Sequence, residues 1–167
     1  MNYSKIYECD TANGYGIRYT IFVSGCEHHC KQCHNPSTWD FNYGAEWTDI
    51  QQNEMVSYLK AHSYVNGVTI SGGDPLHPRN INTVLSIIKT VKNINKTVWV
   101  YTGYTYEYLS TLPIWNELSK YIDILVDGEF EIDKKDLRLL FRGSSNQRLI
   151  DVQSSIKENK VILYEHD

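Results

Sequence analysis

Three of the four cysteines in this 167-residue sequence lie close together, at Cys26, Cys30 and Cys33. Thiolates are soft ligands that select zinc or iron–sulfur clusters. The sequence begins without the apolar run of a secretory signal, so we expect a cytoplasmic protein. In that compartment cysteines are more often metal ligands or catalytic groups than disulfide partners. The fourth cysteine, Cys9, stands apart, and we expect it to be a small buried residue and not a ligand.

Two kinds of metal site fit three thiolates on one short loop. A structural zinc site needs a fourth ligand, for which the candidates are Cys9, His28, His29 and His34. His29 and His34 each adjoin a cysteine, which makes a shared tetrahedral geometry awkward, and we expect the three histidines to be polar loop residues. In a [4Fe–4S] cluster three thiolates bind three irons, and the fourth iron stays open to a substrate. We therefore favour a [4Fe–4S] cluster with an open iron and keep a zinc-binding interaction module as the alternative.

Strands and helices alternate along the rest of the chain. β-branched and aromatic residues predict a strand over 16–23 that runs directly into the cysteines. The other predicted strands are 68–70, 97–101, 122–126 and 161–164, and the predicted helices are 49–62, 80–93, 105–112 and 114–121. This alternation indicates βαβ units, so we expect one α/β domain over residues 1–167 with a mostly parallel sheet. Because the chain is too short for an eight-unit barrel, the expected architecture is a partial, open (βα) barrel.

Four of the predicted strands end in a turn that contains glycine. These turns are Ser24-Gly25-Cys26, Ser71-Gly72-Gly73, Thr102-Gly103 and Asp127-Gly128. Ligands of parallel α/β proteins bind at the carboxyl ends of the strands, so we expect the four turns to line one rim. Glycines at the rim would let the backbone approach a ligand closely.

Composition and charge argue against two classes of partner. The sequence has 41% hydrophobic and 22% charged residues, as an ordinary globular protein does. Its net charge of −4 argues against a nucleic-acid-binding surface. No apolar run approaches the ~20 residues that a membrane helix needs. We expect neither nucleic acid nor membrane as a partner, while a protein partner remains open.

The Cys-x-x-x-Cys-x-x-Cys spacing after a first strand resembles the signature of the radical S-adenosylmethionine superfamily. The resemblance implies that Cys26, Cys30 and Cys33 bind the cluster and that its open iron chelates the methionine moiety of S-adenosylmethionine. It also implies a cofactor contact across Gln32, Cys33 and His34, near the adenine. Gly72-Gly73-Asp74 resembles the Gly-Gly-Glu element that holds the methionyl amino group in that superfamily, with the glycine backbone assigned ahead of the Asp74 side chain. The implied fold is a partial barrel of the radical S-adenosylmethionine type.

Four further stretches narrow the resemblance. Residues 13–18, 33–40, 125–130 and 141–148 resemble the activating proteins of anaerobic ribonucleoside-triphosphate reductase, a family of glycyl-radical-enzyme activases. The resemblance implies hydrogen abstraction from a glycine of that reductase, and a small electron-donor protein such as a flavodoxin as a second partner. We expect the polar stretch from Arg142 to Arg148 to select the reductase or to complete the cofactor site, with a solvated surface loop as the alternative. An activator of the pyruvate formate-lyase type is the nearest rival function.

Overall fold

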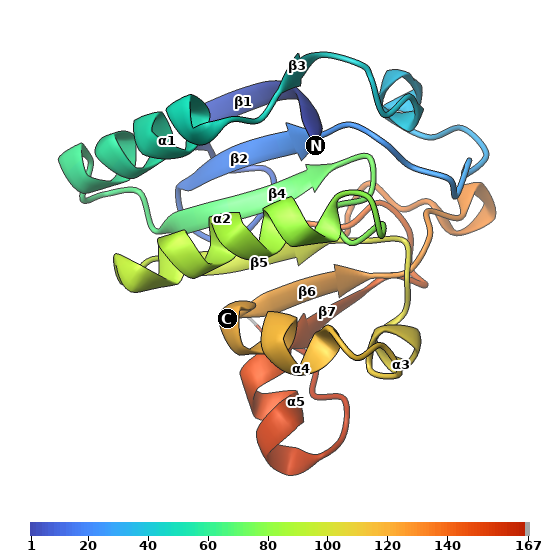
Figure 1. Ribbon diagram of the computed structural model, residues 1–167. Helices are drawn as coiled ribbons and strands as arrows, with labels where there is room; N and C mark the ends of the chain where they lie inside the picture. Colours follow the sequence, from blue (N-terminus) through green and yellow to red (C-terminus); the bar gives the residue numbers. More distant parts are fainter. Residues whose placement is uncertain (166–167) are drawn as a thin grey trace.

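One seven-stranded sheet organises the protein, whose structure is a computed structural model that describes residues 1–165 (Figure 1). The strands are β1 (Asn2–Asp10), β2 (Arg18–Val23), β3 (Ala45–Glu46), β4 (Gly67–Gly72), β5 (Thr97–Tyr101), β6 (Ile124–Asp127) and β7 (Arg148–Asp151). Their order across the sheet is β3-β1-β2-β4-β5-β6-β7. The neighbours β2–β4, β4–β5 and β5–β6 are parallel, and β1–β2, β1–β3 and β6–β7 are antiparallel.

The expectation of a mostly parallel sheet in a partial, open barrel of the radical S-adenosylmethionine type is wrong. Over residues 1–165 the sheet is mixed and open, because antiparallel strands flank the parallel centre on both sides. These flanking strands escaped prediction for a physical reason. β1 is an edge-side strand with few buried positions, so polar and charged residues fill most of it. β7 buries only Leu149 and Ile150, too short a run for its pattern to predict a strand.

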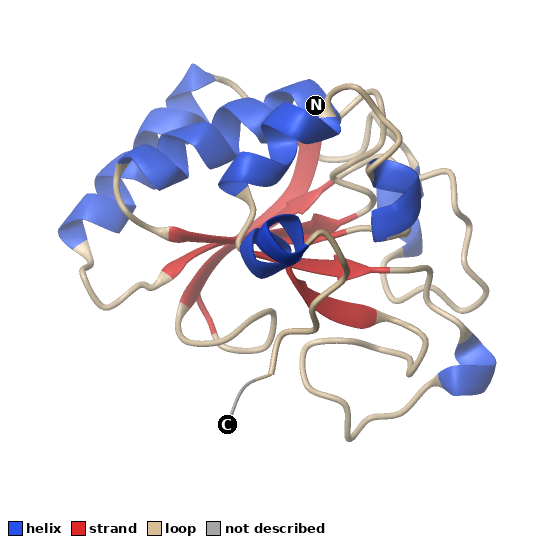
Figure 2. Ribbon diagram, turned by 90° about the horizontal axis from the view of Figure 1, so that it is seen from below, coloured by secondary structure: helices blue, strands red, loops and turns tan. Residues whose placement is uncertain are grey.

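The long helices cover one face of the sheet, and loops cover the other (Figure 2). The helices are α1 (Asp49–Ala61), α2 (Ile81–Asn93), α3 (Tyr106–Leu109), α4 (Trp115–Leu118) and α5 (Val152–Glu158), with 3₁₀ turns η1 (Pro36–Trp39), η2 (Ser119–Tyr121) and η3 (Ile132–Lys134). α2 buries five apolar residues, among them Val84, Ile88 and Val91, in the main core between helices and sheet. A second, smaller cluster of buried residues contains Trp99 and Val126, and Phe141 from a loop packs against it.

Most predicted elements are present with shifted ends, and one is wrong. The strand predicted over 97–101 coincides with β5. The helix predicted over 49–62 is α1, which begins after Thr48 with a capping box between Thr48 and Gln51. Residues 161–164 do not form a strand; Leu163 makes one isolated bridge to Ile150. β1, β3, β7 and α5 were not predicted.

The parallel centre of the sheet decides where the turns lie. Strands β2, β4, β5 and β6 all run in the same direction, so their carboxyl ends lie together at one end of the strands. The cysteine loop follows β2 at this end, and the long loop 128–147 follows β6 there (Figure 1). One rim therefore gathers the chemically interesting segments.

Candidate functional site

The three clustered cysteines share a cavity at this rim. Cys26, Cys30 and Cys33 line a hollow of about 270 Å³ together with residues from all four glycine turns, which confirms the expected rim. The loop bends sharply, because His29 and Gln32 have the left-handed backbone angles φ of 52° and 56°. Such angles are uncommon for residues other than glycine and concentrate at ligand sites.

The base of the cysteine loop is tied to a neighbouring segment. The Gly25 amide donates to the Thr38 carbonyl at 2.7 Å, and the Cys26 amide donates to the Trp39 carbonyl at 3.2 Å. Gly73, at the end of β4, packs against the same base: a Cβ there would lie 2.6 Å from the Gly25 oxygen and 2.8 Å from the Thr38 oxygen. Glycine at 73 is therefore required by backbone packing under the loop.

The surroundings of the thiols determine their protonation. Burial raises the pKa of Cys26 to about 12 and also raises the pKa of Cys30. These thiols would stay neutral near pH 7 without a metal, and a bound metal displaces their protons. The Asn35 amide donates to the Cys33 sulfur at 3.4 Å, a contact of the kind that tunes iron–sulfur clusters. Three sulfur donors on one cavity fit a [4Fe–4S] cluster.

A single metal ion has no comparable ligand set in the described part of the chain. Among residues 1–165, no three side chains of His, Cys, Asp or Glu are grouped as ligands of one ion.

The other residues that the sequence singled out divide into two groups. His34, Gly72 and Gly73 line the cavity beside the cysteines. Gln32 is exposed and Asp74 is fully buried, and neither side chain belongs to the cavity lining.

Cys9 lies far from the cavity. It is exposed on β1, so the expectation that it is buried is wrong. β1 runs antiparallel to β2, and its Asp10 pairs with Arg18 at the start of β2, whereas the cysteine loop follows the end of β2. Cys9 therefore lies near the start of β2, at the opposite end of the strands from the cysteine loop.

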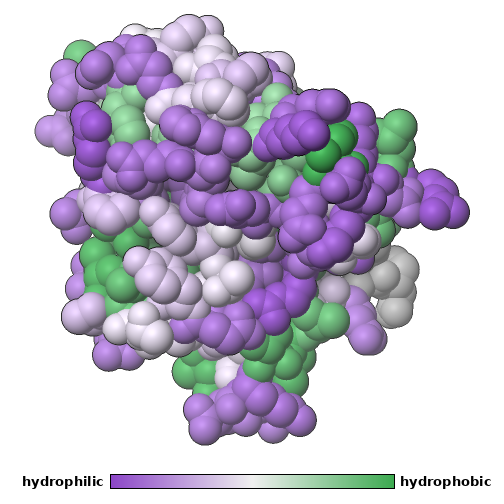
Figure 3. All heavy atoms as spheres, turned by 90° about the vertical axis from the view of Figure 1, so that its right-hand side faces the viewer, coloured by the Kyte–Doolittle hydropathy of each residue, from purple (hydrophilic) through white to green (hydrophobic). Residues whose placement is uncertain are grey.

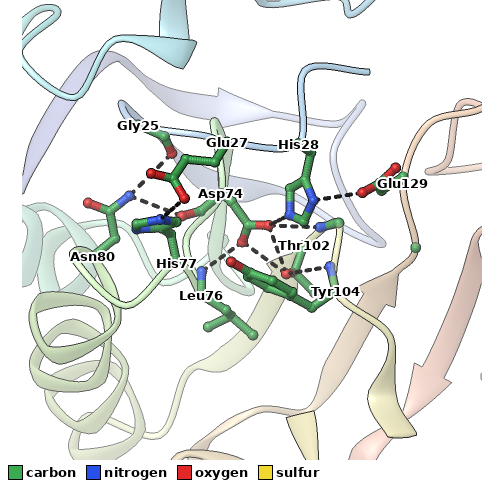
Figure 4. A network of polar contacts seen from close by, with 12 residues as sticks. Gly25, Glu27, His28, Asp74, Leu76, His77, Asn80, Thr102, Tyr104 and Glu129 are labelled. Atoms are coloured by element: carbon green, nitrogen blue, oxygen red, sulfur yellow. Dashed lines mark hydrogen bonds and ion pairs between the residues drawn. The ribbon is translucent and has the colours of Figure 1, made fainter. Parts of the chain in front are cut away.

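Asp74 sits at the centre of a network of polar contacts (Figure 4). One of its oxygens accepts from the Leu76 amide and from the Thr102 hydroxyl, both at 2.9 Å. The other accepts from the Gly103 amide at 3.0 Å and lies 2.5 Å from Nε2 of His28. The carboxylate thus joins the ends of β4 and β5 to the cysteine loop.

His28, between Cys26 and Cys30, makes contacts that the sequence did not reveal. Its Nδ1 lies 2.8 Å from Oε1 of Glu129, so the ring contacts two carboxylates (Figure 4). The hydrogen bond to Asp74 is the main cause that raises the pKa of His28. Its partners are 46 and 101 residues away along the chain, and no local pattern connects residues at such separations.

The stretch 141–148 lies partly at the cavity and partly in a salt-bridge network. Gly143 and Gln147 line the cavity. Arg148 instead pairs with Asp127 at 2.5 Å and with Glu107 at 2.7 Å. Arg142 donates to the Gln147 carbonyl within its own loop.

The loop 128–147 also contacts the cysteine loop. The Phe130 ring meets His34 edge-on at 4.9 Å, and Oε1 of Glu129 lies 2.8 Å from Nδ1 of His28. Within the loop, the Asn146 side-chain amide donates to the Glu129 carbonyl at 2.8 Å. Figure 3 looks onto the side of the molecule where this rim lies; hydrophilic atoms cover most of it, and hydrophobic atoms occur in separate groups. None of the helices in residues 1–165 is both long and apolar enough to cross a membrane.

Comparison with known proteins agrees with the cysteine cavity. A family model described as a 4Fe-4S single cluster domain matches residues 12–150. The anaerobic ribonucleoside-triphosphate reductase-activating protein of Pasteurella multocida is 43% identical over 150 residues, which are 88% of this chain and 95% of that protein. The proteins of the same name from Enterobacteria phage T4 and Escherichia coli K12 are 42% and 40% identical, over 89% and 88% of this chain and 93% and 96% of their own lengths.

The fold and the site thus define a protein with a single 4Fe–4S cluster domain. Within that class, the chain belongs to the family of anaerobic ribonucleoside-triphosphate reductase-activating proteins.

Proposed function

We propose that this chain is an iron–sulfur activase that uses S-adenosylmethionine to generate a glycyl radical on an anaerobic ribonucleoside-triphosphate reductase. The observation that carries the proposal is the cavity that Cys26, Cys30 and Cys33 line together, while Cys9 lies at the opposite end of the strands. Three ligands without a fourth leave one iron of a [4Fe–4S] cluster open. Membership of the activating-protein family supports the choice of reductase.

Side chains and backbone at the rim would divide the tasks of this scheme. The three cysteines would each hold one iron, and the backbone of Gln32, Cys33, His34, Gly72 and Gly73 would border S-adenosylmethionine. A bound cluster would supply the one electron needed for reductive cleavage of S-adenosylmethionine at its S–C5′ bond, and the adenosyl product would take a hydrogen atom from a glycine Cα of the reductase. A site for such chemistry must exclude water. Phe130, Gly143 and Gln147, from the loop 128–147, line part of the cavity and would help to exclude water.

The scheme requires two protein partners. The reductase must offer a glycine whose bare backbone can enter the cavity. A small electron-donor protein such as a flavodoxin would reduce the cluster, and the reaction would take place in the cytoplasm.

Cleavage of S-adenosylmethionine provides the test of the proposed function. The chain would be reconstituted with iron and sulfide without oxygen, then mixed with dithionite, S-adenosylmethionine and the reductase. We expect a brown protein that contains sulfide, and equal amounts of 5′-deoxyadenosine and methionine by chromatography. A colourless protein that takes up zinc and leaves S-adenosylmethionine intact would contradict the proposal and favour a zinc-binding module.

A further inference from the structure

The Asp74 carboxylate has no free place for another donor. It follows Gly72 and Gly73, which line the cavity, yet its side chain is only 1% exposed. A carboxylate offers about four lone-pair sites. Four donors already occupy them: the amides of Leu76 and Gly103, the Thr102 hydroxyl and the ring of His28. An ammonium group from a ligand would first have to displace one of them.

His28 is held on every side within this network (Figure 4). Its side chain is 13% exposed, and its two ring nitrogens contact Asp74 and Glu129. The Tyr104 ring meets the imidazole edge-on at 4.7 Å. A Cβ on Gly103 would lie 2.5 Å from the imidazole, so the chain has room for this ring only because residue 103 is glycine.

Asn80 and the backbone of Asp74 hold the base of the cysteine loop. Nδ2 of the buried Asn80 lies 3.1 Å from the Ser24 carbonyl and 3.0 Å from the Asp74 carbonyl. The Asp74 amide donates to the Gly25 carbonyl at 2.8 Å. Backbone contacts therefore hold the loop where it leaves β2, and His28 holds it between its first two cysteines.

We infer that His28 is a positioning residue that fixes the Cys26–Cys33 loop between Asp74 and Glu129, and that Asp74 serves this brace instead of the methionyl amino group of S-adenosylmethionine. The inference rests on the proposed function. It gives the Gly72 and Gly73 backbone the cofactor contact and gives the carboxylate next to them a different task. Because Glu129 adjoins Phe130 in the cavity wall, the brace also ties the cysteine loop to the loop 128–147.

Two measurements on the reconstituted full chain test the brace: the rate at which a chelator removes iron, and the affinity for labelled S-adenosylmethionine in equilibrium dialysis. Partners that orient metal ligands typically contribute 10- to 100-fold to metal affinity. We expect His28→Ala to release iron about 10-fold to 100-fold faster and to change the electron paramagnetic resonance line shape of the reduced cluster. The amide of His28→Gln can still donate to one of the two carboxylates. This variant should release iron at a rate between those of the wild type and of His28→Ala. His62→Ala removes a histidine at the C-terminal end of α1, outside the cavity lining, and should leave the rate unchanged.

A double-mutant cycle tests the role of Asp74. If Asp74 acts through His28, the pair Asp74→Asn and His28→Ala should release iron no faster than the faster single variant, and Asp74→Asn should not weaken S-adenosylmethionine binding further once His28 is Ala. Glu129→Ala, at a half-exposed position, should also speed release. A wild-type rate in His28→Ala would overturn the brace. A further loss of affinity from Asp74→Asn in the His28→Ala background would return Asp74 to the cofactor site.

These outcomes are separable from failure of the proposed function. If the wild-type chain held no cluster or bound no S-adenosylmethionine, the proposed function would fail before any variant was compared. If the wild-type chain did both but formed no glycyl radical, the choice of reductase would fail, and the brace would still be decided by iron release and affinity.

Discussion

Cys30 and Cys9 carry the same thiol in different surroundings. Cys30 is half-buried at the cavity, where burial raises its pKa, whereas Cys9 is exposed on β1. Their spacing in the sequence was enough to separate the two, because three cysteines in one loop form a pattern and one distant cysteine does not. His28 had no such pattern. Its role depends on Asp74 and Glu129, which only the folded sheet brings to it.

The first prediction compares these two cysteines. Cys30→Ala should lose the cluster on anaerobic reconstitution, because two thiolates cannot hold three irons. Cys9→Ala should bind iron and sulfide in wild-type amounts. Chemical determination of iron and of sulfide in each variant measures the loss. Equal loss of iron in the two variants would mean that the three-ligand site is incorrect.

The loop 128–147 shows why the end of the chain was hard to predict. The polar stretch from Arg142 to Arg148, at the end of this loop, suggested a segment that selects the reductase or completes the cofactor site, or else a solvated loop. The structure gives Arg142 and Arg148 different contacts. Arg148 begins the unpredicted β7 and joins it to β6 and α3 through Asp127 and Glu107. Asp127 is 1% exposed, and it also accepts from the Tyr106 amide at 2.8 Å. Arg148 therefore has a structural role, while Gly143 and Gln147 line the cavity.

Removal of Arg148 should therefore destabilise the fold. Arg148→Ala would leave the buried Asp127 carboxylate without its charged partner. We expect the free energy of unfolding to fall by about 2 kcal/mol, the typical contribution of a hydrogen bond to a charged group. Urea denaturation measures it. Arg138→Ala is the matched control, because Arg138 pairs with Asp136 on the surface; its effect should stay within about 0.5 kcal/mol. Equal effects in both variants would contradict the structural role of Arg148.

At the scale of the whole molecule, the parallel centre of the sheet was predictable and its borders were not. The short apolar strands at 68–70 and 97–101 and the glycine turns after them indicated a common rim, and the cavity confirms it. The partial barrel was wrong because polar strands flank that centre with antiparallel pairing. Local sequence does not encode which neighbours an edge strand will find, and such strands carry few apolar residues.

The central claim is that this cavity creates a radical on the reductase and not on another enzyme. It is tested most directly by electron paramagnetic resonance of the anaerobic reductase after incubation with the reconstituted chain, reductant and S-adenosylmethionine. We expect a glycyl radical signal on the reductase and none when pyruvate formate-lyase takes its place. A silent reductase beside a strong signal on pyruvate formate-lyase would show that the chain is the rival activator.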